Sequence, residues 1–175
     1  MMLWIHGGAF TSGEASDSLF DGGNMASRGD VVVVGINYRL STLGFLALND
    51  GKTNGNYGIG DQITALEWVQ QHIRAFGGDP DRVTVFGQSA GAASVRALMG
   101  SPKAIGKFAG AIQMSNLAGF GFAQPYSFYF SIPDLVNFAV KPMLAETNCT
   151  DATDVLACLK AVDPHTLVGL PDTAK

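Results

Sequence analysis

A Gly-x-Ser-x-Gly pattern, Gly87-Gln88-Ser89-Ala90-Gly91, constrains this chain more than any other sequence feature. It follows a β-branched run at residues 82–86 and precedes an Ala-rich stretch. This order predicts a strand, a very tight turn and a helix, with the hydroxyl of Ser89 exposed at the turn. Gly87 and Gly91 have a structural role, because a side chain there would collide with the neighbouring strand or helix. Ser89 is therefore a candidate nucleophile, and the alternative is an ordinary turn with a surface serine.

Strand and helix patterns alternate along the chain, which indicates an α/β fold with a mainly parallel sheet flanked by helices. The run at residues 31–36 (Val-Val-Val-Val-Gly-Ile) is typical of a strand buried on both faces of such a sheet. The other expected elements are strands at residues 2–5, 82–86 and 109–114 and helices at residues 61–76, 90–99, 135–146, 153–161 and 164–170.

The helix predicted over residues 61–76 should begin with Asp61 as its N-cap and end at Gly77-Gly78. Pro142 should interrupt the helix predicted at residues 135–146, whereas Pro164 suits a first helical position. The apolar face of the first of these helices is expected to comprise Ile63, Leu66, Val69, Ile73 and Phe76.

A second motif, Trp4-Ile5-His6-Gly7-Gly8-Ala9-Phe10, follows the first predicted strand. Acyl transfer passes through a tetrahedral oxyanion, which needs backbone N–H donors already aimed at it. We expect these donors to be the N–H groups of Gly8, Ala9 and Ala90. His6 is expected to support the loop structurally, and the alternative is a general base. A phosphate-binding role is disfavoured, because no helix pattern starts directly after the loop.

Charge and composition exclude several partners. The net charge is −4 and no cluster of Lys or Arg occurs, so we expect no nucleic-acid partner. No apolar run approaches the roughly 20 residues of a membrane-spanning helix, so we expect no transmembrane segment. No motif indicates a cofactor or a metal, and we expect neither.

Cys149 and Cys158 are the two cysteines of the chain, and their spacing fits neither a Cys-x-x-Cys redox motif nor a zinc site. A local disulfide is the favoured interpretation, and two buried free thiols are the alternative. Asn148 begins an Asn-x-Thr acceptor sequence for N-glycosylation. A disulfide and a glycan together would indicate an oxidising, secretory setting.

These motifs together resemble the type-B carboxylesterases, the family of cholinesterases, fungal lipases and liver-type carboxylesterases. The resemblance covers nearly the whole chain. Besides the two motifs above, it includes residues 33–46, 55–62, 65–84, 111–115 and 149–159, the last resembling the second disulfide loop of the fungal branch. It implies an α/β-hydrolase fold and secretion. It also implies a buried ion pair between Arg39 and Asp61, and two separately solvated charges are the alternative. The aromatic stretch at residues 120–130 would line an acyl or alcohol pocket or pack in the core.

The chain departs from the family pattern at three positions. Gln88 stands where the family usually has Glu before the nucleophile, so a buried negative charge is missing. Ala9 replaces the third glycine of the oxyanion loop but should still present its N–H. Asn116 stands where a glycine normally follows Ser115.

A serine nucleophile of this fold needs a carboxylate and then a histidine after it in the chain. His6 and His72 precede Ser89, and His165 lies directly after Asp163 in a short helix pattern, so we assign neither partner. We expect residues 1–175 to form one partial α/β-hydrolase domain, incomplete at both ends and without a signal peptide.

The resemblance implies a serine hydrolase that cleaves small-molecule or lipid carboxylic esters through an acyl-enzyme on Ser89. The isolated chain is expected to be inactive. One alternative is a catalytically inactive, cholinesterase-like binding or adhesion protein, although such relatives usually lose the serine. A serine peptidase is a further alternative, disfavoured by the esterase-like motifs.

Overall fold

The structure, a computed structural model, describes residues 1–116 and 130–169, and the chain divides into two compact units. The first unit comprises residues 1–38 and 58–128, and the second comprises residues 39–57 and 129–175. The expectation of a single domain over residues 1–175 stays a prediction.

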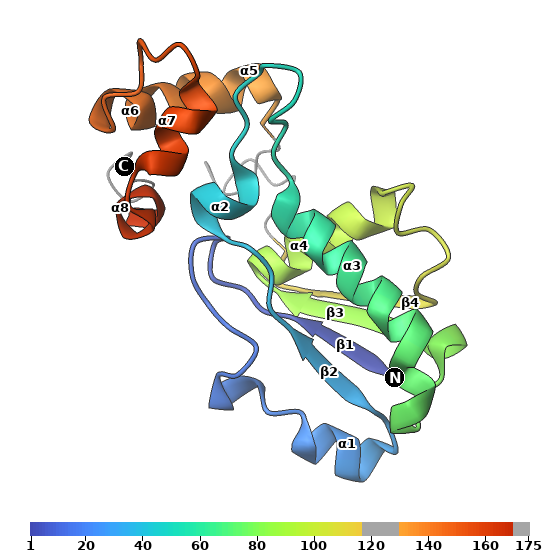
Figure 1. The fold of residues 1–175 in the computed structure, drawn as a ribbon. Coiled ribbons are helices and arrows are strands. Elements are labelled where there is room, and N and C mark those ends of the chain that lie inside the picture. Colours follow the sequence, from blue (N-terminus) through green and yellow to red (C-terminus); the bar gives the residue numbers. More distant parts are fainter. Residues whose placement is uncertain (117–129, 170–175) are drawn as a thin grey trace. The chain divides into compact units, whose positions relative to one another are not determined.

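A four-stranded parallel sheet forms the centre of the first unit, with strand order β2-β1-β3-β4 (Figure 1). The four strands are the expected ones, and their parallel arrangement confirms the predicted fold class. Their bounds are Met2–Ile5 (β1), Val33–Ile36 (β2), Thr84–Gln88 (β3) and Gly110–Met114 (β4).

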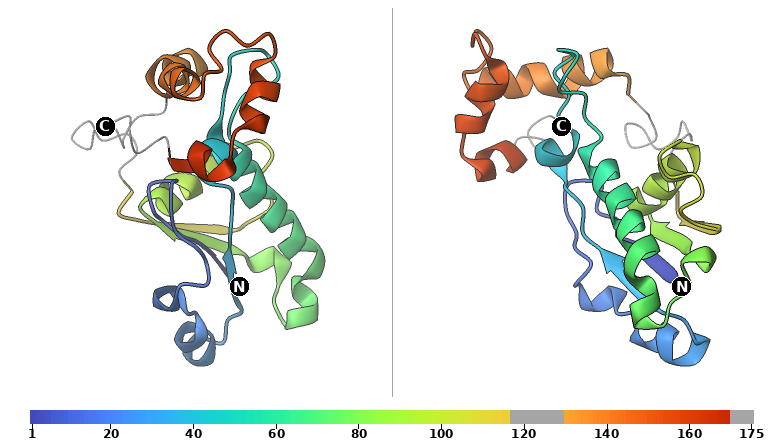
Figure 2. Two further views of the ribbon diagram at one scale, coloured as in Figure 1. Left: turned by 60° about the vertical axis from the view of Figure 1, so that its left-hand side comes forward. Right: turned by 45° about the vertical axis from the view of Figure 1, so that its right-hand side comes forward.

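Helices connect the strands as the parallel arrangement requires. After β1 come the short 3₁₀ turn η1 (Ser18–Phe20) and α1 (Gly23–Gly29), which lies beside β2. The helix α3 (Tyr57–His72), apart from its first residue, lies in this unit, and α4 (Ala90–Gly100) packs on β1, β3 and β4 (Figure 2). Two further 3₁₀ turns, η2 (Ile73–Phe76) and η3 (Pro80–Arg82), lead from α3 to β3.

The core of the first unit lies between the sheet and these two helices. Its fully buried side chains come from β1, α3, η2, β3 and α4 and from the residue just before β3, as burial of one apolar stripe per helix requires. They include Leu3, Ile5, Leu66, Val69, Ile73, Val83, Val85, Val95 and Leu98.

Two expectations for the third helix are wrong. The helix begins at Tyr57 and not after Asp61, so Asp61 is a residue of the helix interior. Gly58 and Gly60 lie in its first turns despite their low helix propensity. Phe76, expected on the buried face, is 62% exposed. It is the last residue of the 3₁₀ turn η2, in which the chain no longer follows the α-helical spacing. Gly77 ends this segment in the left-handed conformation, as predicted.

The run at residues 31–36 is also placed differently from expectation. Only Val33–Ile36 forms the strand β2, and of these four residues Ile36 alone is buried. Within the described residues β2 is the outermost strand, paired with β1 on one side. Of the apolar run at residues 31–36, only Ile36 is therefore buried, and the other residues are partly or fully exposed.

The second unit is helical. It contains α2 (Ser41–Phe45), α5 (Ile132–Leu135), the π-turn η5 (Val136–Val140), α6 (Lys141–Glu146), α7 (Val155–Ala161) and α8 (Pro164–Gly169). Pro142 has the expected effect: the regular α-helical pattern gives way to the π-turn just before it, with the Lys141 N–H bonded to the carbonyl of Val136. α8 begins at Pro164, as predicted.

Candidate active site

The turn after β3 holds Ser89 in a conformation that non-glycine residues rarely adopt. Its φ is 55° and its ψ is −119°, between the last residue of β3 and the first of α4. The Ser89 N–H donates to the Met114 carbonyl (3.0 Å), and its own carbonyl accepts from the Ala93 N–H (3.0 Å). The backbone is therefore fixed on both sides, at a strain cost of roughly 1–3 kcal/mol.

The hydroxyl of Ser89 is left available by this geometry. Ser89 occupies the N-cap position of α4 but makes no side-chain capping hydrogen bond. The residue is partly exposed. Its hydroxyl thus does not serve to cap the helix, which is the ordinary structural role of a serine at this position.

Gly87 and Gly91 lie on either side of Ser89 in this sharp turn. A Cβ added to Gly91 would overlap the Ile5 carbonyl oxygen, and one added to Gly87 would lie 2.6 Å from the Gly91 carbonyl carbon. All of these obstacles are backbone atoms, which cannot rotate away. The elbow can therefore fit against β1 only with glycine at both positions.

The loop after β1 also has an unusual backbone. Gly8, Ala9 and Phe10 all have positive φ, at 111°, 55° and 62°. The Gly8 carbonyl oxygen accepts from the N–H groups of Thr11 and Ser12, both at 3.0 Å. In a trans peptide unit the C=O and the N–H point in opposite directions, so the Ala9 N–H points away from these donors. Within the described residues the N–H groups of Gly8 and Ala9 have no hydrogen-bond partner.

The sheet register brings this loop beside the elbow. β1 and β3 are parallel neighbours in which Ile5 pairs with Gly87, so both strands end at the same edge. A Cβ added to Gly7 would lie 2.7 Å from the Gln88 carbonyl oxygen and 3.3 Å from Ser89 Cβ. The motif that follows β1 therefore lies directly against the turn that holds Ser89. The Ala90 N–H, in the first turn of α4, has no intrahelical partner.

His6 supports the loop and is almost completely buried, with 1% of its surface exposed. Its Nδ1 lies 2.8 Å from the Gly7 carbonyl oxygen, so this nitrogen carries the proton and donates it. Its ring stacks on Tyr38 with centroids 4.5 Å apart, and the Tyr38 hydroxyl donates to the His6 carbonyl (2.8 Å). Burial raises the pKa of Tyr38. These contacts are those of a structural residue.

Sequence reasoning missed Gly7 and Tyr38 as parts of this site. Gly7 lies directly against the elbow, although the sequence drew attention to its two successors. Tyr38 follows β2, which pairs with β1 on the side away from β3, and its hydroxyl donates to the His6 carbonyl. The available signal was the strand order, since a residue just after a strand adjacent to β1 must lie close to the loop.

The remaining expected residues are placed as follows. The Arg39 guanidinium lies over the Tyr57 ring, 5.5 Å from its centroid, and its ion pair with Asp61 stays a prediction. Gln88 is exposed. The aromatic stretch at residues 120–130 lies outside the described residues, except Phe130.

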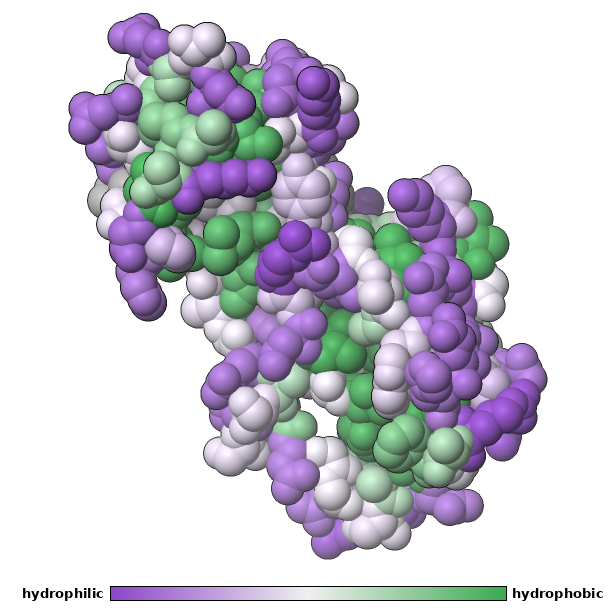
Figure 3. All heavy atoms as spheres, viewed as in Figure 1, coloured by the Kyte–Doolittle hydropathy of each residue, from purple (hydrophilic) through white to green (hydrophobic). Residues whose placement is uncertain are grey.

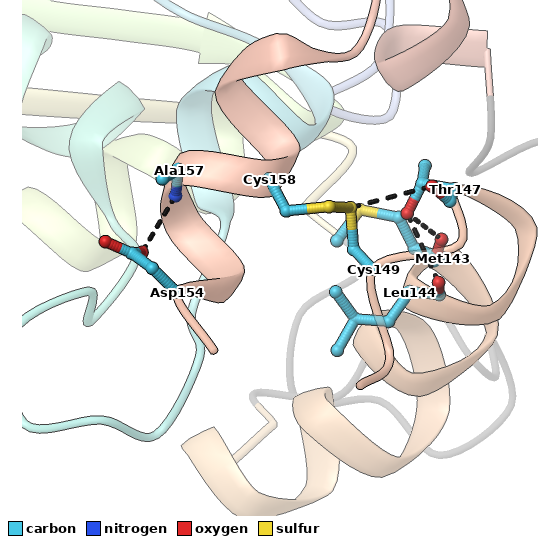
Figure 4. The surroundings of a disulfide bond; sticks show 7 residues. All are labelled: Met143, Leu144, Thr147, Cys149, Asp154, Ala157 and Cys158. Atoms are coloured by element: carbon cyan, nitrogen blue, oxygen red, sulfur yellow. Dashed lines mark hydrogen bonds between the residues drawn. A yellow bond between two sulfur atoms is a disulfide. The ribbon is translucent and has the colours of Figure 1, made fainter. Parts of the chain in front are cut away.

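The predicted disulfide between Cys149 and Cys158 is present in the second unit (Figure 4). Cys149 is fully buried among Val140, Met143, Leu159 and Leu167, and Asp154 caps α7 by accepting from the Ala157 N–H (2.9 Å). The bond thus joins the loop after α6 to α7 within a small apolar core.

A hollow of about 410 Å³ opens on the first unit (Figure 3). Trp4, Phe20, Asp17, Asp21 and Gly35 contribute to its lining, and Ser89 does not. In the described part of the chain, no cluster of three His, Cys, Asp or Glu side chains could hold a metal ion. No helix among the described residues is long and apolar enough to cross a bilayer.

Comparison with known proteins agrees with this geometry. Residues 1–173 match the sequence model described as "Carboxylesterase family". The chain is 41% identical over 175 residues to the bile salt-activated lipase of Mus musculus, and the match covers 95% of this chain and 28% of the lipase. It is 51% identical over 118 residues to the para-nitrobenzyl esterase of Bacillus subtilis (66% and 24% of the two chains). Over 175 residues it is 41% identical to carboxylesterase 5A of Ovis aries (100% and 44%). The chain thus spans less than half the length of these relatives.

Proposed function

We propose that this chain, which belongs to the carboxylesterase family, supplies the nucleophile and the oxyanion hole of a serine hydrolase acting on carboxylic esters. The observation that carries the proposal is the placement of Ser89. It stands in a strained turn with its hydroxyl outside the helix cap, against a loop in which the N–H groups of Gly8 and Ala9 have no hydrogen-bond partner in the described part of the chain. A serine kept for a structural purpose would have no need of this strain.

In the proposed reaction, Ser89 Oγ attacks the ester carbonyl carbon and gives up its proton to a base. The carbonyl oxygen becomes an oxyanion, which accepts hydrogen bonds from the N–H groups of Gly8, Ala9 and Ala90. The N-terminus of α4 adds a favourable dipole. Collapse of the tetrahedral intermediate expels the alcohol, and water then releases the acid from Ser89. We assign neither the base nor the carboxylate that would orient it.

The substrate class follows from the family. Relatives carry the names lipase, para-nitrobenzyl esterase and cocaine esterase, so we propose small-molecule or lipid esters as substrates. The disulfide between Cys149 and Cys158 supports a secreted, oxidising location. The alternative of an inactive binding or adhesion protein is not favoured, because Ser89 is present in the elbow geometry that nucleophilic attack requires.

The test is turnover of a short p-nitrophenyl ester by the complete protein that contains this chain, beside its Ser89→Ala variant. We expect the variant to lose roughly 10³-fold or more in kcat, because only oxyanion-hole and binding contributions remain. The 175-residue chain alone should show no multiple turnover, since a serine without its base is a poor nucleophile. Equal turnover by the complete protein and its variant would refute the proposal.

A further inference from the structure

The motif Asn148-Cys149-Thr150 has no part in the proposed ester hydrolysis. It is the only Asn-x-Ser/Thr sequence in the 175 residues, and neither its middle residue nor the following Asp151 is proline. An oligosaccharide transferase reads such a sequence through the asparagine amide and the threonine hydroxyl. A glycan on this chain, attached through nitrogen, could therefore sit at one position only.

The structure presents both of these groups on the surface of the second unit. Asn148 and Thr150 are exposed, and neither side chain makes a hydrogen bond to another described residue. Asn148 follows the end of α6 in the left-handed conformation, with φ of 57°. Its N–H donates to the Ala145 carbonyl (3.3 Å), so the backbone is anchored while the amide is left in solvent.

The middle residue of the motif has the opposite environment. Cys149 is fully buried and bonded to Cys158. The Cys149 N–H donates to the Leu144 carbonyl (2.8 Å), and the Thr147 hydroxyl donates to the Met143 carbonyl (2.8 Å) (Figure 4). The folded segment is therefore fixed at its centre. A transferase that must hold residues 148–150 in its own site could not lift them from this core.

We infer that Asn148 is an N-glycosylation site that is modified before the bond between Cys149 and Cys158 closes. In the transfer, a bond forms between Asn148 Nδ2 and the anomeric carbon of a lipid-linked diphosphate oligosaccharide. The bond from that carbon to the diphosphate oxygen breaks, the lipid diphosphate leaves with the electron pair, and Nδ2 loses one proton. Closing the disulfide ends the period in which the site can react.

A purely conformational reason for this asparagine makes different predictions. Asparagine is favoured at a left-handed position after a helix, whatever its modification. Thr150 has no part in that preference. Thr150→Ala and Thr150→Ser therefore form a matched pair, because both preserve Asn148 and only the second preserves the acceptor motif. Cys158→Ser tests the timing, because it leaves the motif intact and prevents the disulfide.

The experiment is translation of the chain, fused to a cleavable secretion signal, in the presence of endoplasmic-reticulum microsomes. Protease protection identifies the translocated chains. Among these, wild type and Thr150→Ser should show one mobility shift that is reversed by peptide N-glycosidase, and Thr150→Ala should show none. The released peptide should carry aspartate at position 148. These readouts depend neither on ester hydrolysis nor on final folding, so failure here would leave the hydrolase proposal standing.

The order of glycosylation and disulfide closure is measured from the fraction of translocated chains that carry a glycan at Asn148. Under oxidising conditions Cys158→Ser should be occupied more fully than wild type, and a reductant should raise wild type to the level of the variant. Protected wild-type chains without a glycan, or a glycan that persists in Thr150→Ala, would overturn the site. Equal and incomplete occupancy of wild type and Cys158→Ser under oxidising conditions, or addition of the glycan to chains whose disulfide has already closed, would overturn the proposed order of events.

Discussion

Replacing Ser89 by glycine should stabilise the protein while abolishing its proposed chemistry. With φ of 55° and ψ of −119°, Ser89 stores roughly 1–3 kcal/mol of backbone strain, which glycine does not experience. Glycine also makes the unfolded chain more flexible, at a cost of about 0.4–1 kcal/mol. The net expectation is a gain of about 1 kcal/mol, or an increase in Tm of roughly 2–4 °C.

Ser89→Ala is the reference for this comparison, because alanine has the same Cβ, and therefore the same strain, but lacks the hydroxyl. Thermal or urea unfolding of purified Ser89→Gly and Ser89→Ala proteins measures the difference directly. Both variants should be inactive toward esters. If Ser89→Gly were no more stable than Ser89→Ala, the strained turn would not exist in solution, and the argument from strain to function would fail.

Two further predictions concern the residues that surround Ser89. Gly91→Ala should destabilise the protein by about 3 kcal/mol, because its Cβ would overlap the Ile5 carbonyl. Gly60→Ala should be stabilising, because the space around this helical glycine is open. Urea unfolding midpoints that shift in the same direction for both variants would refute this prediction. Tyr38→Phe should cost about 1 kcal/mol at neutral pH by removing the hydrogen bond to His6. Burial raises the pKa of Tyr38, so wild type should lose stability as the pH rises above about 10 and the variant should lose less. If the free energy of unfolding fell equally with pH in both proteins, burial of the neutral Tyr38 hydroxyl would be contradicted.

Local sequence signals predicted the parts of the fold in which one motif determines the backbone. The elbow could be predicted because Gly87 and Gly91 leave few alternatives for a turn that must pass β1. The pairing of Cys149 with Cys158 could be predicted because their short separation allows a local bond. The disulfide joins residues only nine positions apart. The elbow glycines meet Ile5 of β1, which is distant in sequence, but the fixed Gly-x-Ser-x-Gly spacing still indicates the turn.

Features that depend on tertiary contacts could not be predicted in this way. Gly58 and Gly60 look like loop residues, and Asp61 looks like a cap, yet the helix begins before all three. The apolar run of β2 indicates a central strand, but burial depends on its neighbours in the sheet. Ala9 and Phe10 adopt positive φ, which residue propensity does not indicate because neither residue type favours it.

Covalent labelling of Ser89 tests the central claim most directly. A fluorophosphonate reacts with a serine hydroxyl that is activated as a nucleophile and leaves a stable phosphonyl group on its oxygen. The complete protein containing this chain should take up one such group, and peptide mapping should place it on Ser89, with no labelling in Ser89→Ala. A label on any other serine, or equal labelling of the two proteins, would contradict the account.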